Sequence, residues 1–173
     1  MGQTILACDD QGNFLEYIPK EIGHTGAGRR HLAITVLIYN SKGEVLLQKR
    51  RHQVFNNVWD FTASTHPLHQ NNTDETFEQA SKRALKDEYD IENVSLKIIG
   101  EFNYFAKNGE FCENEHCALM TGKYDGPFKL NPEVGYECIW MGKEQFLEDL
   151  DKNPQKYGPW VISGAKFLKQ KHL

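Results

Sequence analysis

Residues 112–117 read CENEHC, which places two cysteines, two glutamates and a histidine within six positions. Such a set could form a zinc knuckle, a disulfide or a working pair of carboxylates. In a β-strand, successive side chains point to opposite faces, so Glu113, Glu115 and Cys117 would share one face. Cys112 would lie on the other face, which spoils a zinc site that uses both cysteines. Extended chain also separates the two thiols by far more than the ~5.5 Å between the Cα atoms of a disulfide. A carboxylate pair remains.

Two carboxylates held side by side repel each other, and a metal ion or a proton must relieve that repulsion. The candidate partners are His24 and His31, seven residues apart, and His66, which follows the apolar run 58–63. Imidazoles combined with carboxylates suit Mn, Zn or Fe better than Mg alone. Spacing alone does not bring these segments together. Ordinary charges on an exposed strand, and histidines with structural roles, therefore remain an alternative.

Length and composition favour one folded domain, residues 1–173, with a substantial core, because 39% of the residues are hydrophobic and 12% are aromatic. The net charge of -4 disfavours a general nucleic-acid-binding protein. No apolar run approaches the ~20 residues of a membrane span, and the first residues lack the layout of a secretory signal. We therefore expect a cytoplasmic protein whose four cysteines are reduced thiols.

Apolar runs rich in β-branched and aromatic residues predict strands at 4–8, 14–18, 31–39, 44–50, 58–63, 94–106, 110–124 and 136–141. Helical spacing predicts a helix within 71–91, with Asn72 and Thr73 as candidate N-caps. A second helix is expected to start around Pro159, and a shorter third at 143–152. This order predicts an α+β fold, with a mixed sheet flanked by helices.

Several of these segments resemble the type I isopentenyl-diphosphate isomerases, a branch of the Nudix superfamily. The resemblance runs from about residue 9 to residue 166 and rests on HLAITVLIYNSKGEVLLQKR, on VW followed by HPL, on ENE and on GPWVISGAKFL. It implies a Nudix-type α/β/α sandwich. It also implies metal-dependent isomerisation of isopentenyl diphosphate to dimethylallyl diphosphate, a step of isoprenoid biosynthesis.

The resemblance further implies a Mn or Zn ion bound by five side chains, which are His24, His31, His66, Glu113 and Glu115. Glu115 would also act as a proton donor or acceptor. Glu88 matches a family glutamate that helps to hold Mg through the diphosphate. An ordinary surface role for Asp87 and Glu88 remains the alternative.

The same helix also resembles the Nudix hydrolase pattern G-x5-E-x7-R-E-U-x-E-E-x-G-U. Arg83 matches the pattern, and Asp87 and Glu88 take its acidic pair, but Ala84 replaces a glutamate. Hydrolases use such carboxylates to hold Mg ions around a diphosphate, so the alanine weakens that interpretation. Hydrolysis of a nucleoside or prenyl diphosphate is the alternative function.

A small-molecule diphosphate requires cations, and the candidates are Lys20, Arg50 and Arg83. A further lysine of the family is missing from the shorter loop RHQVFNN. Tyr104 and Trp160 match aromatic positions near the reacting carbons, where an indole face stabilises a developing carbocation. The alternatives are solvated surface positions for the cations and core packing for the aromatic rings.

One catalytic position departs from the isomerases, since Ser64 occupies the place of their cysteine. A thiol, with a pKa of ~8.5, can exchange protons at working pH, whereas an unassisted serine hydroxyl is far too weak an acid. The sequence Trp59-Asp60-Phe61 also departs from the family's W-T-N. Three functions stay open: an isomerase with an altered proton relay that includes Ser64, a hydrolase, and a non-catalytic diphosphate-binding protein.

Overall fold

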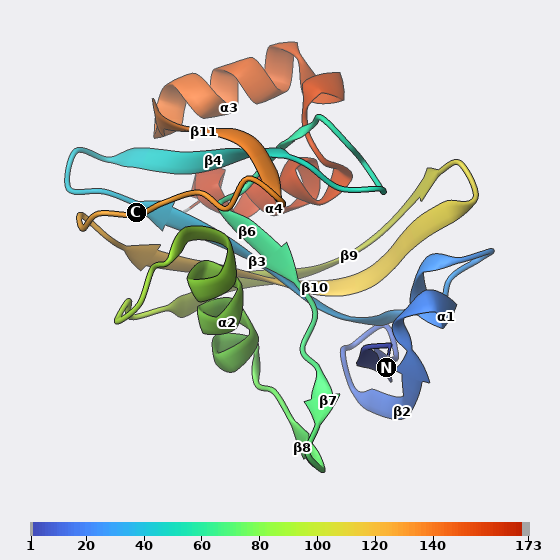
Figure 1. Ribbon diagram of the computed structural model, residues 1–173. Coiled ribbons are helices and arrows are strands. Elements are labelled where there is room, and N and C mark those ends of the chain that lie inside the picture. Colours follow the sequence, from blue (N-terminus) through green and yellow to red (C-terminus); the bar gives the residue numbers. More distant parts are fainter. Residues whose placement is uncertain (1, 171–173) are drawn as a thin grey trace.

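The computed structural model describes residues 2–170, in which helices lie on both sides of a strongly curved mixed sheet (Figure 1). The helices are α1 (Lys20–His24), α2 (Phe77–Tyr89), α3 (Lys143–Lys152) and α4 (Pro159–Gln170). The main sheet contains β1 (Thr4–Cys8), β2 (Phe14–Pro19), β3 (His31–Tyr39), β4 (Glu44–Arg50), β5 (Trp59–Asp60), β6 (Ala63–Thr65), β9 (Lys97–Asn108), β10 (Phe111–Lys123) and β11 (Gly135–Gly142). A separate hairpin joins β7 (His69–Gln70) to β8 (Thr73–Asp74). The α+β prediction is confirmed.

Strand β3 is the central element of the sheet. It pairs in parallel with β10 and antiparallel with β6, and it also contacts β1 and β4. Its sequence, HLAITVLIY, is almost continuously apolar, as expected for a strand that is covered on both faces. The parallel pairing sets His31 opposite Glu115, and this register determines the geometry of the site.

Alternation along β3 divides the core into two layers. Ile34, Val36 and Ile38 pack with the buried face of α2 in one layer. Leu37 packs in the other layer, with buried residues of α3 and α4. Figure 1 shows the same arrangement, with α2 on one side of the sheet and α3 and α4 on the other. Since strand side chains point alternately to opposite faces, one apolar strand contributes to both layers.

The long hairpin β9–β10 turns through a two-residue loop, because Asn108 pairs with Phe111 across the turn. Gly109 has φ +62°, a left-handed conformation that glycine adopts without steric cost. The hairpin positions Glu113 and Glu115 on one face of β10, as the alternation predicted.

The predicted start of the central helix was wrong. Residues 69–74 form the β7–β8 hairpin, whose turn includes Asn72 at φ +57°, and Thr73 is a strand residue. Helix α2 instead begins after Thr76, whose hydroxyl accepts from the Gln79 backbone N–H. The Gln79 side chain accepts from the Thr76 N–H in return. This reciprocal capping box satisfies two otherwise free donors and outcompetes the earlier cap candidates.

Two further local differences affect the site. The run 58–63 was predicted as one strand, but it divides into β5 and β6 around Phe61, which is fully buried. The short helix α1 was not predicted, and it carries Lys20 and His24 at its two ends. Five residues are too few for a periodic apolar pattern to appear. No helix among residues 2–170 is long and apolar enough to span a membrane.

The capping box predicts that Thr76→Ala lowers the free energy of unfolding by about 1 kcal/mol, because one cap hydrogen bond is lost. Thr73→Ala is the matched control, and its stability should stay close to that of the unaltered protein. Urea denaturation followed by circular dichroism measures both. A larger loss from Thr73→Ala would contradict the assignment of Thr76 as the cap.

Candidate metal centre and adjoining cavity

Three histidines from distant segments meet at one end of the central strands. His24 ends α1, His31 begins β3, and His66 follows β6. Their ring centroids lie 4.7 Å (His24–His31), 4.8 Å (His24–His66) and 4.9 Å (His31–His66) apart, so the imidazoles form a nearly equilateral triangle. All three are buried.

Two local contacts hold α1 in position for this triangle. Thr25, which follows His24, bridges to Phe111 at the start of β10. Gly23 lies against the His31 ring, where an added Cβ would come within 2.7 Å of Nδ1. A larger residue would therefore push α1 away from β3 and separate the two histidines.

The glutamates of β10 face the triangle. Glu115 Oε1 lies 3.0 Å from His66 Nε2, 3.5 Å from His31 Nε2 and 4.0 Å from His24 Nε2. Glu113 Oε2 lies 3.3 Å from His24 Nε2. Ligand atoms of the three histidines and Glu115 all lie within 4.8 Å of one another, which suits binding of one ion.

Backbone contacts orient two of the imidazoles toward the centre. Nδ1 of His24 donates to the Lys20 carbonyl and Nδ1 of His31 donates to the Arg29 carbonyl, each at 2.8 Å. In the neutral imidazoles the hydrogen therefore sits on Nδ1, which leaves each Nε2 free to offer a lone pair to a metal ion. His31 Nε2 is buried and makes no hydrogen bond within residues 2–170. A buried lone pair without a donor fits a divalent ion as its partner.

Burial and mutual charge determine which groups carry protons. Burial raises the pKa of Glu113, and the adjacent charge of Glu115 raises it further. Burial also acts to raise the pKa of Glu115, but the neighbouring His31, Glu113 and Tyr104 outweigh it and lower the pKa to about 2. Burial and the other imidazoles keep the pKa of His66 well below its usual value. A neutral imidazole beside an ionised carboxylate is the state that metal binding requires.

A cavity in two connected parts adjoins this group. The inner part, about 30 Å³, is bordered by Ile34, Ser64, Tyr104, Cys117, Trp160 and both glutamates. The outer part, about 100 Å³, is bordered by Lys20, Gln48, Arg50, Arg51, His52 and Glu88. Arg50, Ser64, His66 and Glu113 border both parts. The inner part combines the apolar surfaces of Ile34, Tyr104 and Trp160 with polar side chains, whereas cations gather around the outer part.

Asp60 organises the wall between the two parts. Its Oδ1 accepts hydrogen bonds from the Ser64 hydroxyl at 3.1 Å and from the Trp160 indole N–H at 2.5 Å. Its Oδ2 lies 3.3 Å from Arg50 Nη1. The Thr35 hydroxyl lies 2.9 Å from Ser64 Oγ on the other side. Sequence analysis did not select Asp60 as functional, although an acidic residue inside the apolar run VWDFTA was a signal.

Two other groups on the inner wall touch or adjoin Glu115. The Tyr104 hydroxyl donates to Glu115 Oε2 at 2.5 Å, and burial together with the glutamate charges raises the pKa of Tyr104 well above its usual value. Burial, followed by the charge of Glu115, likewise raises the pKa of the Cys117 thiol well above normal. Both groups therefore keep their protons at neutral pH.

A family model described as the NUDIX domain matches residues 29–161. The chain belongs to the Nudix family. Two curated relatives named isopentenyl-diphosphate Delta-isomerase are each 27% identical to it. The one from Citrobacter koseri aligns over 99% of this chain and 95% of its own length. The one from an Enterobacter species aligns over 98% and 92%, respectively.

Solved structures confirm the Nudix fold. The protein DR0079 from Deinococcus radiodurans superimposes with a TM-score of 0.73 at 14% identity, covering 95% of this chain and 98% of that chain. A MutT protein from Methanosarcina mazei superimposes with a TM-score of 0.64 at 20% identity, covering 82% of this chain and 94% of that protein. At these identities the likeness concerns the fold alone.

Three polar residues of the Nudix helix α2 lie in different environments. Glu88 borders the outer cavity, accepts from Gln48 Nε2 at 2.8 Å, and has a pKa raised by burial to about 8. Asp87 is exposed. Arg83, which is predicted to contact substrate, donates to Glu75 at 2.8 Å and to the His66 carbonyl at 2.9 Å. Its guanidinium therefore holds the His66 segment in place.

The candidate metal centre predicts that Zn²⁺ or Mn²⁺ raises the melting temperature of chelator-stripped protein. At a hundredfold excess over Kd, bound metal adds about 2.7 kcal/mol to the free energy of unfolding. His66→Ala should lose most of this gain. His69→Ala, three residues away on β7, is the matched control and should keep it. Equal metal stabilisation of both variants in thermal unfolding would contradict the centre.

Proposed function

We propose that this Nudix protein is a metal-dependent isomerase that converts isopentenyl diphosphate to dimethylallyl diphosphate. The observation that carries the proposal is the two-part cavity beside the histidine–glutamate group. A small space bordered by Ile34, Tyr104 and Trp160 suits a short branched hydrocarbon, and a cation-lined space next to it suits a diphosphate. Similarity to relatives with this named activity supports the same assignment.

Binding of the diphosphate would use the outer cavity. Lys20 and Arg50 supply positive charge there, and Glu88 would share a Mg²⁺ ion with the phosphate oxygens. Burial lowers the pKa of Lys20, although the Glu113 charge opposes this effect. The hydrocarbon would then extend past Arg50 into the inner cavity, which Arg50 also borders.

The inner cavity contains groups suited to proton transfer and to a cationic intermediate. Isomerisation adds a proton to one carbon and removes one from another. Glu115, with the Tyr104 hydroxyl bound to it, would exchange a proton on one side of the substrate. The Trp160 indole would stabilise positive charge at the branched carbon by cation–π attraction. A divalent ion held by the histidines and glutamates would offset the carboxylate charge.

Ser64 occupies the position of the catalytic cysteine of the isomerases, and its hydroxyl alone is too weak an acid for that role. Its hydroxyl donates to the buried carboxylate of Asp60, whose pKa is raised by burial. Ser64 would therefore take a proton from the substrate while passing its own to the Asp60 carboxylate, which accepts the Ser64 hydrogen bond and which burial makes a better proton acceptor. This arrangement replaces the thiol of the isomerases by a carboxyl–hydroxyl pair.

A Nudix hydrolase is the second candidate function. Glu88 beside the cation-lined cavity favours it, because Nudix helix carboxylates hold Mg around a diphosphate. The pattern is incomplete, since Ala84 replaces one of its glutamates and is buried in the core. This replacement favours isomerisation over hydrolysis.

The test is to incubate the protein with isopentenyl diphosphate, Mg²⁺ and Mn²⁺ in heavy water and to follow proton and phosphorus NMR together. Isomerisation predicts deuterium incorporation and signals of the dimethylallyl isomer, with the diphosphate intact. Release of phosphate without isomerisation would instead identify a hydrolase. Bound substrate without turnover in either spectrum would identify a binding protein.

The proton relay predicts that Ser64→Cys increases the isomerisation rate, by about tenfold or more, because a thiol exchanges protons more readily than a hydroxyl. Ser64→Ala is the matched control and should be slower than the unaltered protein. Initial rates from the same NMR assay measure both. Equal rates for all three proteins would exclude Ser64 from the relay.

A further inference from the structure

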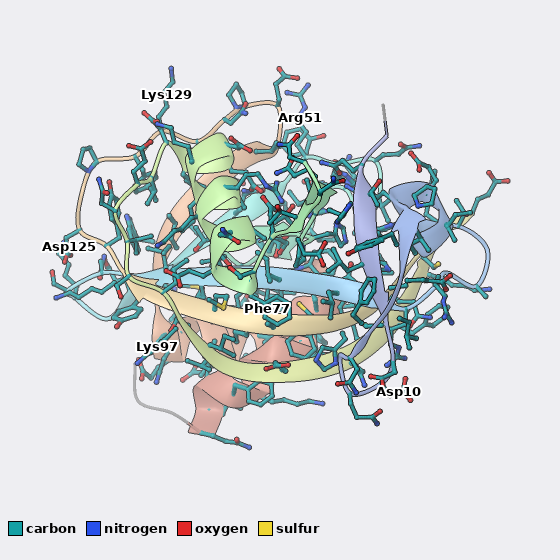
Figure 2. All side chains as sticks on the ribbon, turned by 90° about the horizontal axis from the view of Figure 1, so that it is seen from below. Asp10, Arg51, Phe77, Lys97, Asp125 and Lys129 are labelled. Carbon is teal, nitrogen blue, oxygen red and sulfur yellow. The ribbon has the colours of Figure 1, made fainter. Side chains whose placement is uncertain are left out.

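The loop between β4 and β5 forms one wall of the outer cavity and is held at several points. The Phe55 N–H donates to Asn108 Oδ1 at 3.2 Å, and the Phe55 ring lies 5.6 Å from the Trp160 ring. Arg51 Nη1 donates to the Pro132 carbonyl at 2.8 Å. Figure 2 shows Arg51 at the rim of the molecule, toward the end of α2 opposite Phe77. The side chains that this loop presents to the cavity therefore have defined positions.

His52 is the titratable side chain of this loop. Its ring borders the outer cavity together with Lys20, Arg50 and Arg51. The Val54 N–H donates to His52 Nδ1 at 3.1 Å, so the neutral ring carries its hydrogen on Nε2. Nε2 makes no hydrogen bond to any residue in 2–170, and it remains available to a ligand.

The backbone around His52 also accommodates the protonated ring. The Val54 carbonyl lies 3.3 Å from Nδ1 and would accept a hydrogen bond from it once Nδ1 carries a proton. Val54 thus provides a donor for the neutral imidazole and an acceptor for the imidazolium. Protonation would thus exchange the bond from the Val54 N–H for one to the Val54 carbonyl.

Charges on every side of the cavity determine when the proton is taken up. Burial and the positive charge of Arg50, with a smaller effect of Lys20, lower the pKa of His52, while the Val54 contact and Glu113 oppose them. The other charged or titratable groups bordering the cavity are Arg51, Glu88, His24 and His66. Without an anion, this balance favours the neutral ring.

We propose that His52 is a direct diphosphate contact, which donates Nε2–H to a phosphate oxygen and takes up a proton at Nδ1 when the anion binds. The inference rests on the proposed function in one respect, that the ligand is a diphosphate. His52 would fill the role of the lysine that the short loop lacks. The proton comes from solvent, and no covalent bond to the ligand forms.

The direction of the pH effect follows from linkage. The anion raises the pKa of His52, because it replaces repulsion from Arg50 and Lys20 by attraction. The bound state therefore holds more protons than the free state between the two pKa values. Binding tightens as the pH falls through that window and weakens as the pH rises above it.

Calorimetric titration with inorganic diphosphate and Mg²⁺, in buffers of different ionisation enthalpy, measures both affinity and proton uptake. His52→Gln keeps an N–H donor but cannot take up the proton. We expect it to lose the corresponding proton uptake and to bind about tenfold more weakly near pH 6, with little change near pH 8. His52→Lys should bind tightly at both pH values without this uptake.

His69→Gln is the matched control, because His69 lies outside the cavity on β7 and should leave proton uptake unchanged. Protons bound by the ligand or by the metal centre contribute equally to all variants, so they cancel in the comparison. Unchanged proton uptake in His52→Gln would overturn the inference, and so would absence of diphosphate binding at every pH. Binding with these differences but without isomerisation would count only against the proposed function.

Discussion

Repulsion between two buried carboxylates is the constraint on which the site depends. Glu113 and Glu115 lie on one face of β10, away from solvent, where the charge of Glu115 raises the pKa of Glu113. Three imidazoles surround Glu115, and His31, Glu113 and the Tyr104 hydroxyl together lower its pKa, whereas the pKa of Glu113 is raised. A divalent ion bound by these groups would relieve the repulsion between the two carboxylates. The fold must therefore keep three distant histidines within contact of one strand face.

The parallel pairing of β3 with β10 meets part of this requirement directly, since its register sets His31 opposite Glu115. A slip of one residue would turn both glutamates away from the histidines and toward the opposite face. Packing on both faces of β3 resists such a slip, because Ile34 and Leu37 are buried in different layers. The same residues that form the core therefore also fix the positions of the candidate metal ligands.

Sequence reasoning predicted the features that depend on local periodicity. The placement of Glu113 and Glu115 on one face follows from strand alternation, and the strands 4–8, 31–39 and 44–50 have the predicted bounds. The convergence of His24 with His31 depends on Gly23 packing against an imidazole from another element, and no local pattern encodes that contact. The cap at Thr76 was missed because Asn72 and Thr73 are equally good cap residues by type. Asn72 and Thr73 are excluded as caps only because they belong to the β7–β8 hairpin, Asn72 in its turn and Thr73 in its second strand.

Asp60 was missed for a related reason, since its role exists only in the folded protein. It is a buried carboxylate that binds Ser64, Trp160 and Arg50 together, and Arg50 also stacks over the Trp160 ring at 5.1 Å. The Arg50 guanidinium therefore forms an ion pair with Asp60 and also borders the outer cavity, where it can attract a bound anion. A diphosphate that attracts the guanidinium would weaken its hold on Asp60, and the pKa of that carboxyl would rise further. In this arrangement, occupancy of the anion site would make Asp60 a better acceptor for the proton of the Ser64 hydroxyl, which would couple binding at one end of the cavity to proton transfer at the other.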